Sequence, residues 1–254
     1  MSSWLKEIDD LLRGSKTQPE SLAEGTGGLR LQRYAATAAV LGAVYGLSMG
    51  LYGALTHDPA VYAQFFSSAL KVPALFFLTL VVTFPSLYVF SALVGARLDP
   101  LSALRVIVAT ITVSLAVLAS FAPINAFFTL STTSYAFMKL LNVFLFAVAG
   151  AVGLGFLLKT LRHLEEAWGL AESHEGEGTA ADSTPVQDVT AARKAAGRGL
   201  FKLWMCLYAL VGAQMGWLLR PFIGDPKLPF GWFRERGGSV FLDVLQTIED
   251  LLGG

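Results

Sequence analysis

Five long apolar runs constrain the fold of this chain more than any other feature of its sequence. They cover residues 34–55, 72–96, 106–128, 140–158 and 200–219. Each is close to the ~20 residues that a helix needs to cross the hydrocarbon core of a bilayer. Basic residues mark the edges of these runs: Arg33, Lys71, Arg97, Arg105, Lys139, Lys159 and Arg220. The pattern predicts an all-α fold, a polytopic transmembrane helical bundle of about five spans.

The composition agrees with a membrane protein and argues against several other classes. Hydrophobic residues make up 54% of the 254 residues and charged residues 15%, whereas ordinary soluble domains are ~25% charged. Lys plus Arg equals Asp plus Glu at 19 each, so we expect no nucleic-acid partner. One cysteine, Cys206, and three scattered histidines have no metal-ligand spacing. We therefore expect no metal and no cofactor. Because no nucleophile pairs with a base, we also expect no enzymatic activity.

The basic residues predict the orientation of the chain in the membrane. With five crossings, thirteen basic residues fall on the side of the N-terminus and six on the other side. Cytoplasmic loops carry the excess of Lys and Arg, so residues 1–33 are expected in the cytoplasm and residues 220–254 outside it. The expected location is the inner membrane of a bacterium.

The segments outside the apolar runs have two different characters. Residues 3–13 gather apolar side chains on one helical face: Trp4, Leu5, Ile8, Leu11 and Leu12. Residues 239–252 repeat this pattern with Phe241, Val244, Leu245, Ile248 and Leu252. Both patterns predict an amphipathic helix on the membrane surface or on a partner. Residues 172–190, by contrast, are rich in Gly, Ser, Thr and acidic residues and predict a disordered linker.

Glycines in the first apolar run predict a close helix contact. Gly42, Gly46 and Gly50 form two overlapping GxxxG units, and Gly53 follows them. Since apolar side chains gain little by leaving lipid for one another, close backbone approach is a main source of helix association in membranes. We expect a packing seam here, either within one chain or between two copies.

Polar residues in and near the spans are the other candidates for function. Asn125 and Asn142 lie on neighbouring runs and are expected to contact each other, and Gln214 is a third intramembrane polar residue. The densest local feature is an aromatic and proline-rich stretch after the fifth run. Its candidate interface or ligand-binding residues are Trp217, Arg220, Phe222, Asp225, Trp232 and Arg234. Such a stretch is typical either of a structured cap that binds a partner or of an interfacial anchor.

The overall plan resembles that of the Yip1-like membrane proteins. The shared features are a cytoplasmic N-terminal segment, five helices and a C-terminus on the opposite side. The DLYGP-type motif of that family is absent, so the resemblance assigns no residue a role. The stretch QMGWLLRPFIGDP, residues 214–226, is also similar to a segment of uncharacterised bacterial multispan proteins.

These features favour a non-enzymatic integral membrane protein that acts as an assembly, scaffold or partner-binding component. The expected partners are the lipid bilayer and either a second copy or another membrane protein. The alternative is a channel or carrier for a neutral or weakly selected solute. It would be built around the second and third runs, which contain Pro73, Pro85 and Pro123.

Overall fold

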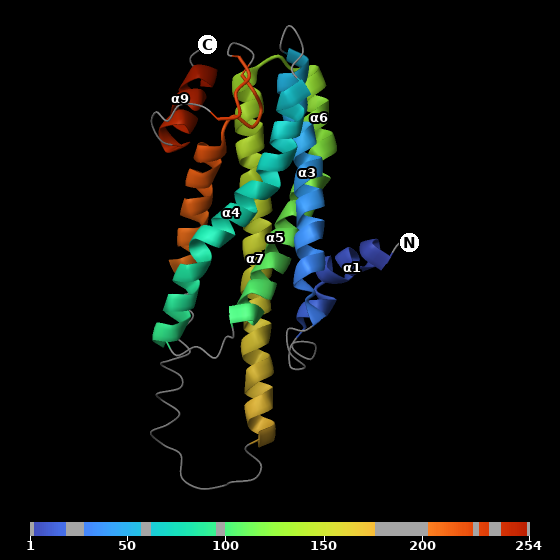
Figure 1. Ribbon diagram of the computed structural model, residues 1–254, viewed down its shortest axis with the longest axis vertical. Helices are drawn as coiled ribbons and strands as arrows, with labels where there is room; N and C mark the ends of the chain where they lie inside the picture. The colour runs from blue at the N-terminus through green and yellow to red at the C-terminus, as the bar shows by residue number, and fades with distance from the viewer. Residues whose placement is uncertain are drawn as a thin grey trace.

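The computed structural model describes residues 3–18, 28–56, 62–94, 100–175, 203–225, 229–233 and 240–252. Every regular element in these ranges is a helix. They are α1 (Ser3–Leu12), η1 (Ser15–Thr17), α3 (Leu31–Thr56), α4 (Tyr62–Val94), α5 (Pro100–Ser120), α6 (Ala122–Ser131), α7 (Tyr135–Glu175), the helix Leu203–Leu219, and α9 (Val240–Leu252). The long helices run along one axis, and α4 crosses the others at an angle (Figure 1). The prediction of an all-α fold is confirmed for this part of the chain.

Four helical stretches in the described ranges are long and apolar enough to cross a membrane. They are Leu31–Thr56, Tyr62–Ser86, Pro100–Ser131 and Tyr135–His163. This composition fits an integral membrane protein. The helix Leu203–Leu219 is apolar but shorter. At 1.5 Å per residue it measures roughly 25 Å, against ~30 Å for the hydrocarbon core, and a fifth crossing stays a prediction.

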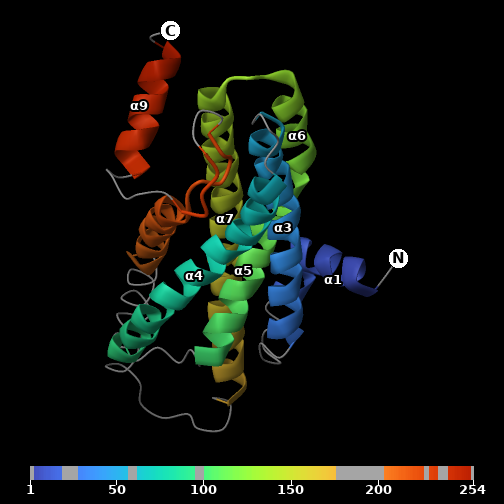
Figure 2. The ribbon, with the colours of Figure 1, turned by 45° about the horizontal axis from the view of Figure 1, so that its top comes forward.

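We call the end of the bundle where α3 and α5 begin the inner end, following the predicted orientation, and the opposite end the outer end. α3 packs against α4, α5 and α6, and α5 packs against α7 (Figure 2). The fully buried side chains between these helices include Tyr45, Tyr52, Leu115, Leu118 and Met138. Large apolar side chains also cover the outside of the bundle, as expected for a surface that faces lipid.

The helix α4 contains Pro73 and Pro85 and diverges from α3 toward the inner end (Figures 1 and 2). The helix Leu203–Leu219 packs beside this diverging half. Trp204 donates a hydrogen bond from Nε1 to the carbonyl oxygen of Thr83 at 3.1 Å, and the Tyr208 hydroxyl donates to that of Phe76 at 3.4 Å. These contacts attach the last predicted span to the rest of the bundle.

Two predicted spans and the linker differ from the structure in their bounds. The third apolar run is divided into α5 and α6 by a break at Phe121. Pro123 lies in the first turn of α6, where its missing N–H leaves no helical bond unmade. The fourth run extends through Glu175, so the disordered linker predicted from residue 172 begins too early. The helix formers Glu, Ala and Leu continue α7 there, and residues 176–190 lie outside the described ranges.

The terminal segments are helical and attached to the bundle. Near α1, Leu11 is fully buried and the Arg33 guanidinium lies 2.6 Å from the Glu7 carboxylate. At the other terminus, Lys139 of α7 pairs with Asp243 of α9 and donates a hydrogen bond to the Thr247 hydroxyl at 2.8 Å. Their location on the membrane surface stays a prediction.

Candidate functional site

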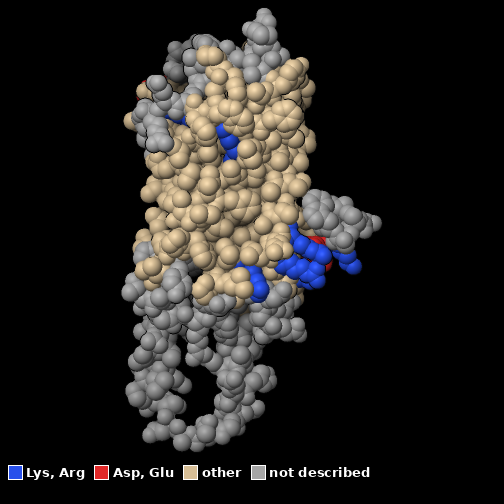
Figure 3. Space-filling model, in the orientation of Figure 1, with Lys and Arg blue, Asp and Glu red and all other residues tan. Residues whose placement is uncertain are grey.

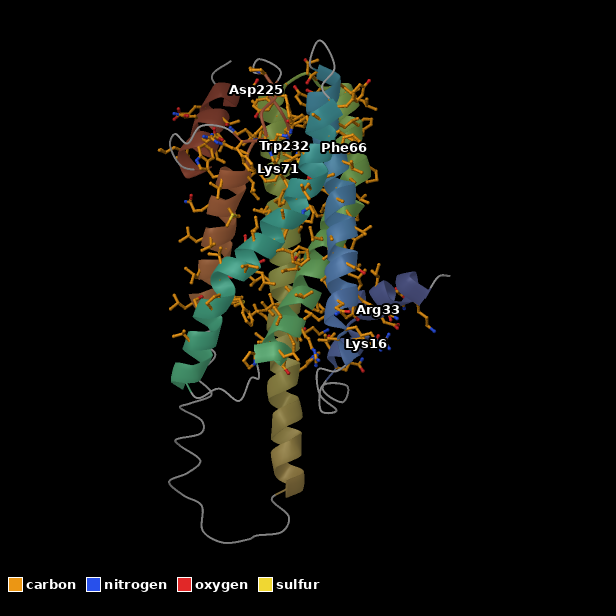
Figure 4. All side chains as sticks on the ribbon, in the orientation of Figure 1. Lys16, Arg33, Phe66, Lys71, Asp225 and Trp232 are labelled. Carbon is orange, nitrogen blue, oxygen red and sulfur yellow. The ribbon has the colours of Figure 1, made fainter. Side chains whose placement is uncertain are left out.

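A buried lysine at the outer end of the bundle holds an irregular segment in place. Lys71 is 3% exposed, and its Nζ donates to the carbonyl oxygens of Pro221 at 2.9 Å and Trp232 at 2.5 Å. The Phe233 ring lies 5.4 Å from the same Nζ. Figure 4 shows the Lys71 and Trp232 side chains close together, with Phe66 nearby. We call the described residues 217–225 and 229–233 the outer cap.

The sequence places Lys71 at the edge of a span, but in the structure it does not mark the start of a helix. The helix α4 begins at Tyr62, so Lys71 lies well inside it and within the candidate span Tyr62–Ser86. The residues before Lys71 are less apolar than those after it, which is why hydropathy alone starts the span too late. Two of these residues, Gln64 and Ser68, contact the cap.

Two further side chains of α4 bind the cap from the same helical face. Gln64 donates from Nε2 to the carbonyl oxygen of Phe222 at 2.8 Å and to the Ser68 hydroxyl oxygen at 3.1 Å. The Ser68 hydroxyl also contacts the carbonyl oxygen of Phe222. Residues 64, 68 and 71 follow the i, i+4, i+7 spacing of one helical face. Together they bring donors to three backbone carbonyls of the cap.

Two glycines allow the cap to enter the bundle. A Cβ on Gly53 would lie 2.3 Å from the carbonyl oxygen of Ile223 and 2.9 Å from Cγ of Gln64. Gly224 has a φ of 82°, in the left-handed region that favours glycine. A Cβ there would also lie 2.9 Å from Cγ of Gln64. Larger residues at either position would move the cap off α3 and α4.

The cap residues selected from the sequence have different roles. Arg220 stacks on Trp217, with its guanidinium carbon 3.5 Å from the ring centroid. Pro221 and Ile223 are buried, whereas Trp232 is 50% exposed and Phe233 63% exposed. Phe222 and Trp232 are held through their carbonyl oxygens. Asp225 lies near the top of the cap in Figure 4, and Arg234 lies outside the described residues.

The glycine seam lies inside one chain. A Cβ on Gly42 would contact Pro73, one on Gly46 would lie 2.3 Å from the carbonyl oxygen of Ser68, and one on Gly50 would lie 2.8 Å from Cα of Phe65. The partner of this face of α3 is therefore α4. Since α4 covers these glycines, they offer no surface to a second copy of the chain.

The two asparagines form a buried polar network with Tyr45. Asn142 donates from Nδ2 to Oδ1 of Asn125 at 3.0 Å and accepts a hydrogen bond from the Tyr45 hydroxyl at 2.7 Å. Asn125 in turn lies 3.4 Å from the Ser48 hydroxyl. This network joins α3, α6 and α7 within three of the candidate spans. Gln214 is exposed on the helix Leu203–Leu219 and does not belong to it.

The sequence analysis did not select Gln64, Ser68 or Lys71 as members of the site. Their i, i+4, i+7 spacing directly before an apolar run was the available signal. Gln64, Ser68 and Lys71 act chemically as hydrogen-bond donors to the backbone of the cap. Ser67 has a buried hydroxyl with no partner among the described residues, and the Nζ of Lys71 donates to two backbone carbonyl oxygens of the cap. The described residues also include no group of side chains that could hold a metal ion.

The chain was compared with known protein families, curated proteins and solved structures, and none of them matches it. The resemblance to the Yip1-like proteins therefore stays a prediction.

Proposed function

We propose that this chain is a non-enzymatic integral membrane protein that binds a partner through the outer cap and so acts as an assembly component. The observation that carries the proposal is that the buried Lys71 donates to two backbone carbonyl oxygens of the outer cap. A charged side chain at membrane depth costs about 2.5–3.5 kcal/mol on insertion scales. In this chain the charged side chain of Lys71 fixes the backbone of the outer cap.

The alternative role for the cap, an anchor that merely lies on the membrane, would not need this arrangement. Water and headgroups satisfy the carbonyls of a surface segment, whereas backbone placed among apolar helices needs donors from the protein. Gln64, Ser68 and Lys71 supply those donors. A segment held in this way presents Trp232 and Phe233 in one conformation, which lowers the entropy cost of binding. Exposed aromatic side chains are also enriched where proteins bind one another.

The packing of the bundle supports a binding role over the alternative of a channel or carrier. The side chains at the centre of the described helices, among them Tyr45, Asn125 and Leu115, are fully buried. Side chains therefore fill the space that a solute pathway along α3 would use. Pro73, which could have opened such a pathway, packs directly against Gly42.

Site-specific photo-crosslinking in cells tests the proposal. A photoreactive residue at Trp232 is expected to give one discrete product, and the product should disappear when Lys71→Met releases the cap. The matched control is the same residue at Leu203, which is 60% exposed at the inner end of the adjoining helix. A product at twice the chain mass would identify a second copy as the partner.

Two results would contradict the proposal. One is a smear of products at both positions that is insensitive to Lys71→Met, which would make the cap an anchor. The other is flux of a small neutral solute into proteoliposomes above that into empty liposomes, which would favour the channel or carrier.

A further inference from the structure

A hollow of about 400 Å³ lies at the inner end of the bundle, opposite the outer cap. Three arginines, Arg30, Arg33 and Arg105, line it together with the leucines at positions 29, 31 and 101. It lies where α3 and α5 begin, and Figure 3 shows Lys and Arg side chains gathered at this end beside α1. The hollow therefore combines a strongly basic lining with an apolar one.

Basic residues outnumber acidic ones in the described parts of residues 3–33 and at the start of α5, with Lys6, Arg13, Lys16, Arg30, Arg33 and Arg105 against Glu7, Asp9 and Asp10. Glu7 pairs with Arg33 at 2.6 Å, and Asp9 pairs with Arg13 at 2.9 Å. The hydrogen bond to Asp9 raises the pKa of the Arg13 guanidinium. Figure 4 places Lys16 next to Arg33 at the junction of α1 and α3. An anion in the hollow would meet Arg30 and Arg105 in addition to the Arg33–Glu7 pair.

The backbone adds to the attraction for an anion. The lining includes the first turn of α3, Leu31 to Arg33, whose N–H groups have no helical acceptor. Such N–H groups and the helix dipole favour negative charge. Arginine has a planar fork of donors that matches two oxygens of a phosphate group. This combination of groups is suited to a phosphate ester.

The leucines indicate whether the phosphate belongs to a lipid or is free in solution. Leu29 is 1% exposed and anchors the chain at the start of α3, whereas Leu101 is 45% exposed at the start of α5. Both helices enter the predicted hydrocarbon core directly from this point. A ligand in the hollow therefore meets both arginines and leucines, and the apolar surface of α3 and α5 continues from the hollow along the candidate spans. We propose that this hollow binds the headgroup of an anionic phospholipid.

Native mass spectrometry of the full chain, released from nanodiscs, tests the proposal. The nanodiscs contain phosphatidylcholine with or without phosphatidylglycerol. The wild-type chain is expected to retain phosphatidylglycerol in preference to phosphatidylcholine. Arg30→Gln combined with Arg105→Gln should weaken that retention by about tenfold or more, since charge-assisted hydrogen bonds are lost. This variant keeps the Arg33–Glu7 pair, so the link between α1 and α3 stays in place.

The matched control is Lys159→Gln combined with Arg162→Gln. It removes the same charge from exposed positions of α7 toward the inner end, and it should retain phosphatidylglycerol as the wild type does. Equal losses in both double variants would show diffuse attraction and overturn the proposal, as would full retention in the arginine variant. Displacement of the lipid by inorganic phosphate at equal concentration would also overturn it, because the hollow would then be a site for free phosphate.

Discussion

Substitutions at Gly46 test whether the close contact between α3 and α4 stabilises the fold. A Cβ there would lie 2.3 Å from the carbonyl oxygen of Ser68, 2.7 Å from Cα of Ala69 and 2.8 Å from the carbonyl carbon of Ser68. All three atoms belong to the backbone, so no side-chain rotation relieves the clash. The two helices have to separate by most of an ångström before even alanine fits.

The expected cost follows from two opposing effects. Alanine in place of glycine favours a helix by ~1 kcal/mol. Overpacking costs about 1–3 kcal/mol, and a gap of about 0.5–1 Å forfeits a quarter to a half of each dispersion contact along the helix pair. We expect Gly46→Ala to destabilise by about 1 kcal/mol and Gly46→Leu by about 3 kcal/mol.

Gly150 of α7 provides the matched control. A Cβ at this position meets nothing within 4 Å, so Gly150→Ala keeps the helix-propensity gain without the clash. It should be neutral or stabilising by up to ~1 kcal/mol, and Gly150→Leu should be tolerated because its side chain points into open space. The two glycines therefore predict opposite signs for the same chemical change.

Thermal melting in one detergent, followed by gel filtration of the protein that remains dispersed, measures the difference. At about 2–4 °C per kcal/mol for a chain of this size, Gly46→Ala should lower the melting temperature by about 2–4 °C and Gly46→Leu by roughly three times as much. Gly150→Ala should leave it unchanged or raise it. Equal melting temperatures for the Gly46 and Gly150 variants would refute a tight seam.

Three further predictions concern other parts of the molecule. The first prediction tests the orientation in a Cys206→Ala background. A cysteine at Ser134, in the exposed turn between α6 and α7, should react with an impermeant thiol reagent on intact cells, whereas a cysteine at Ser15 should not. The reverse labelling pattern would show that the orientation is opposite to the predicted one. Asn142→Leu removes the partner of the Tyr45 hydroxyl and of Oδ1 of Asn125, and it should destabilise by about 1–3 kcal/mol. Tyr45→Phe should destabilise by ~0.6 kcal/mol, and equal melting of both variants would contradict the network. Lys139→Met should release α9 and speed hydrogen exchange over Val240–Leu252 without lowering the melting temperature of the bundle, and unchanged exchange would show that other contacts hold α9.

Hydropathy and residue spacing predicted the helices and the contact between Asn125 and Asn142, but they did not predict the role of the buried Lys71. The apolar runs mark α3 and the central part of α7 within a few residues. The GxxxG spacing locates the face of α3 that α4 covers, although it does not say which helix covers it. Lys71 shows the limit, since a scale that counts every lysine as a boundary starts the span after it. Only the positions of Pro221 and Trp232 reveal why the charge is tolerated.

The residues that a hydropathy scale treats as exceptions provide most of the specific contacts in this bundle. Leucine gains little on moving from lipid to a helix contact, so apolar residues along α3 and α4 do not distinguish one helix arrangement from another. Three other residues do favour one helix arrangement. Gly46 allows the backbones of α3 and α4 to touch, and Asn142 joins three helices through its hydrogen bonds. Lys71 donates to two carbonyl oxygens of the cap. A leucine at position 71 would fit the bilayer better but would leave those carbonyls without that donor. The lysine therefore supports the proposal that the chain holds the outer cap in one conformation for binding a partner.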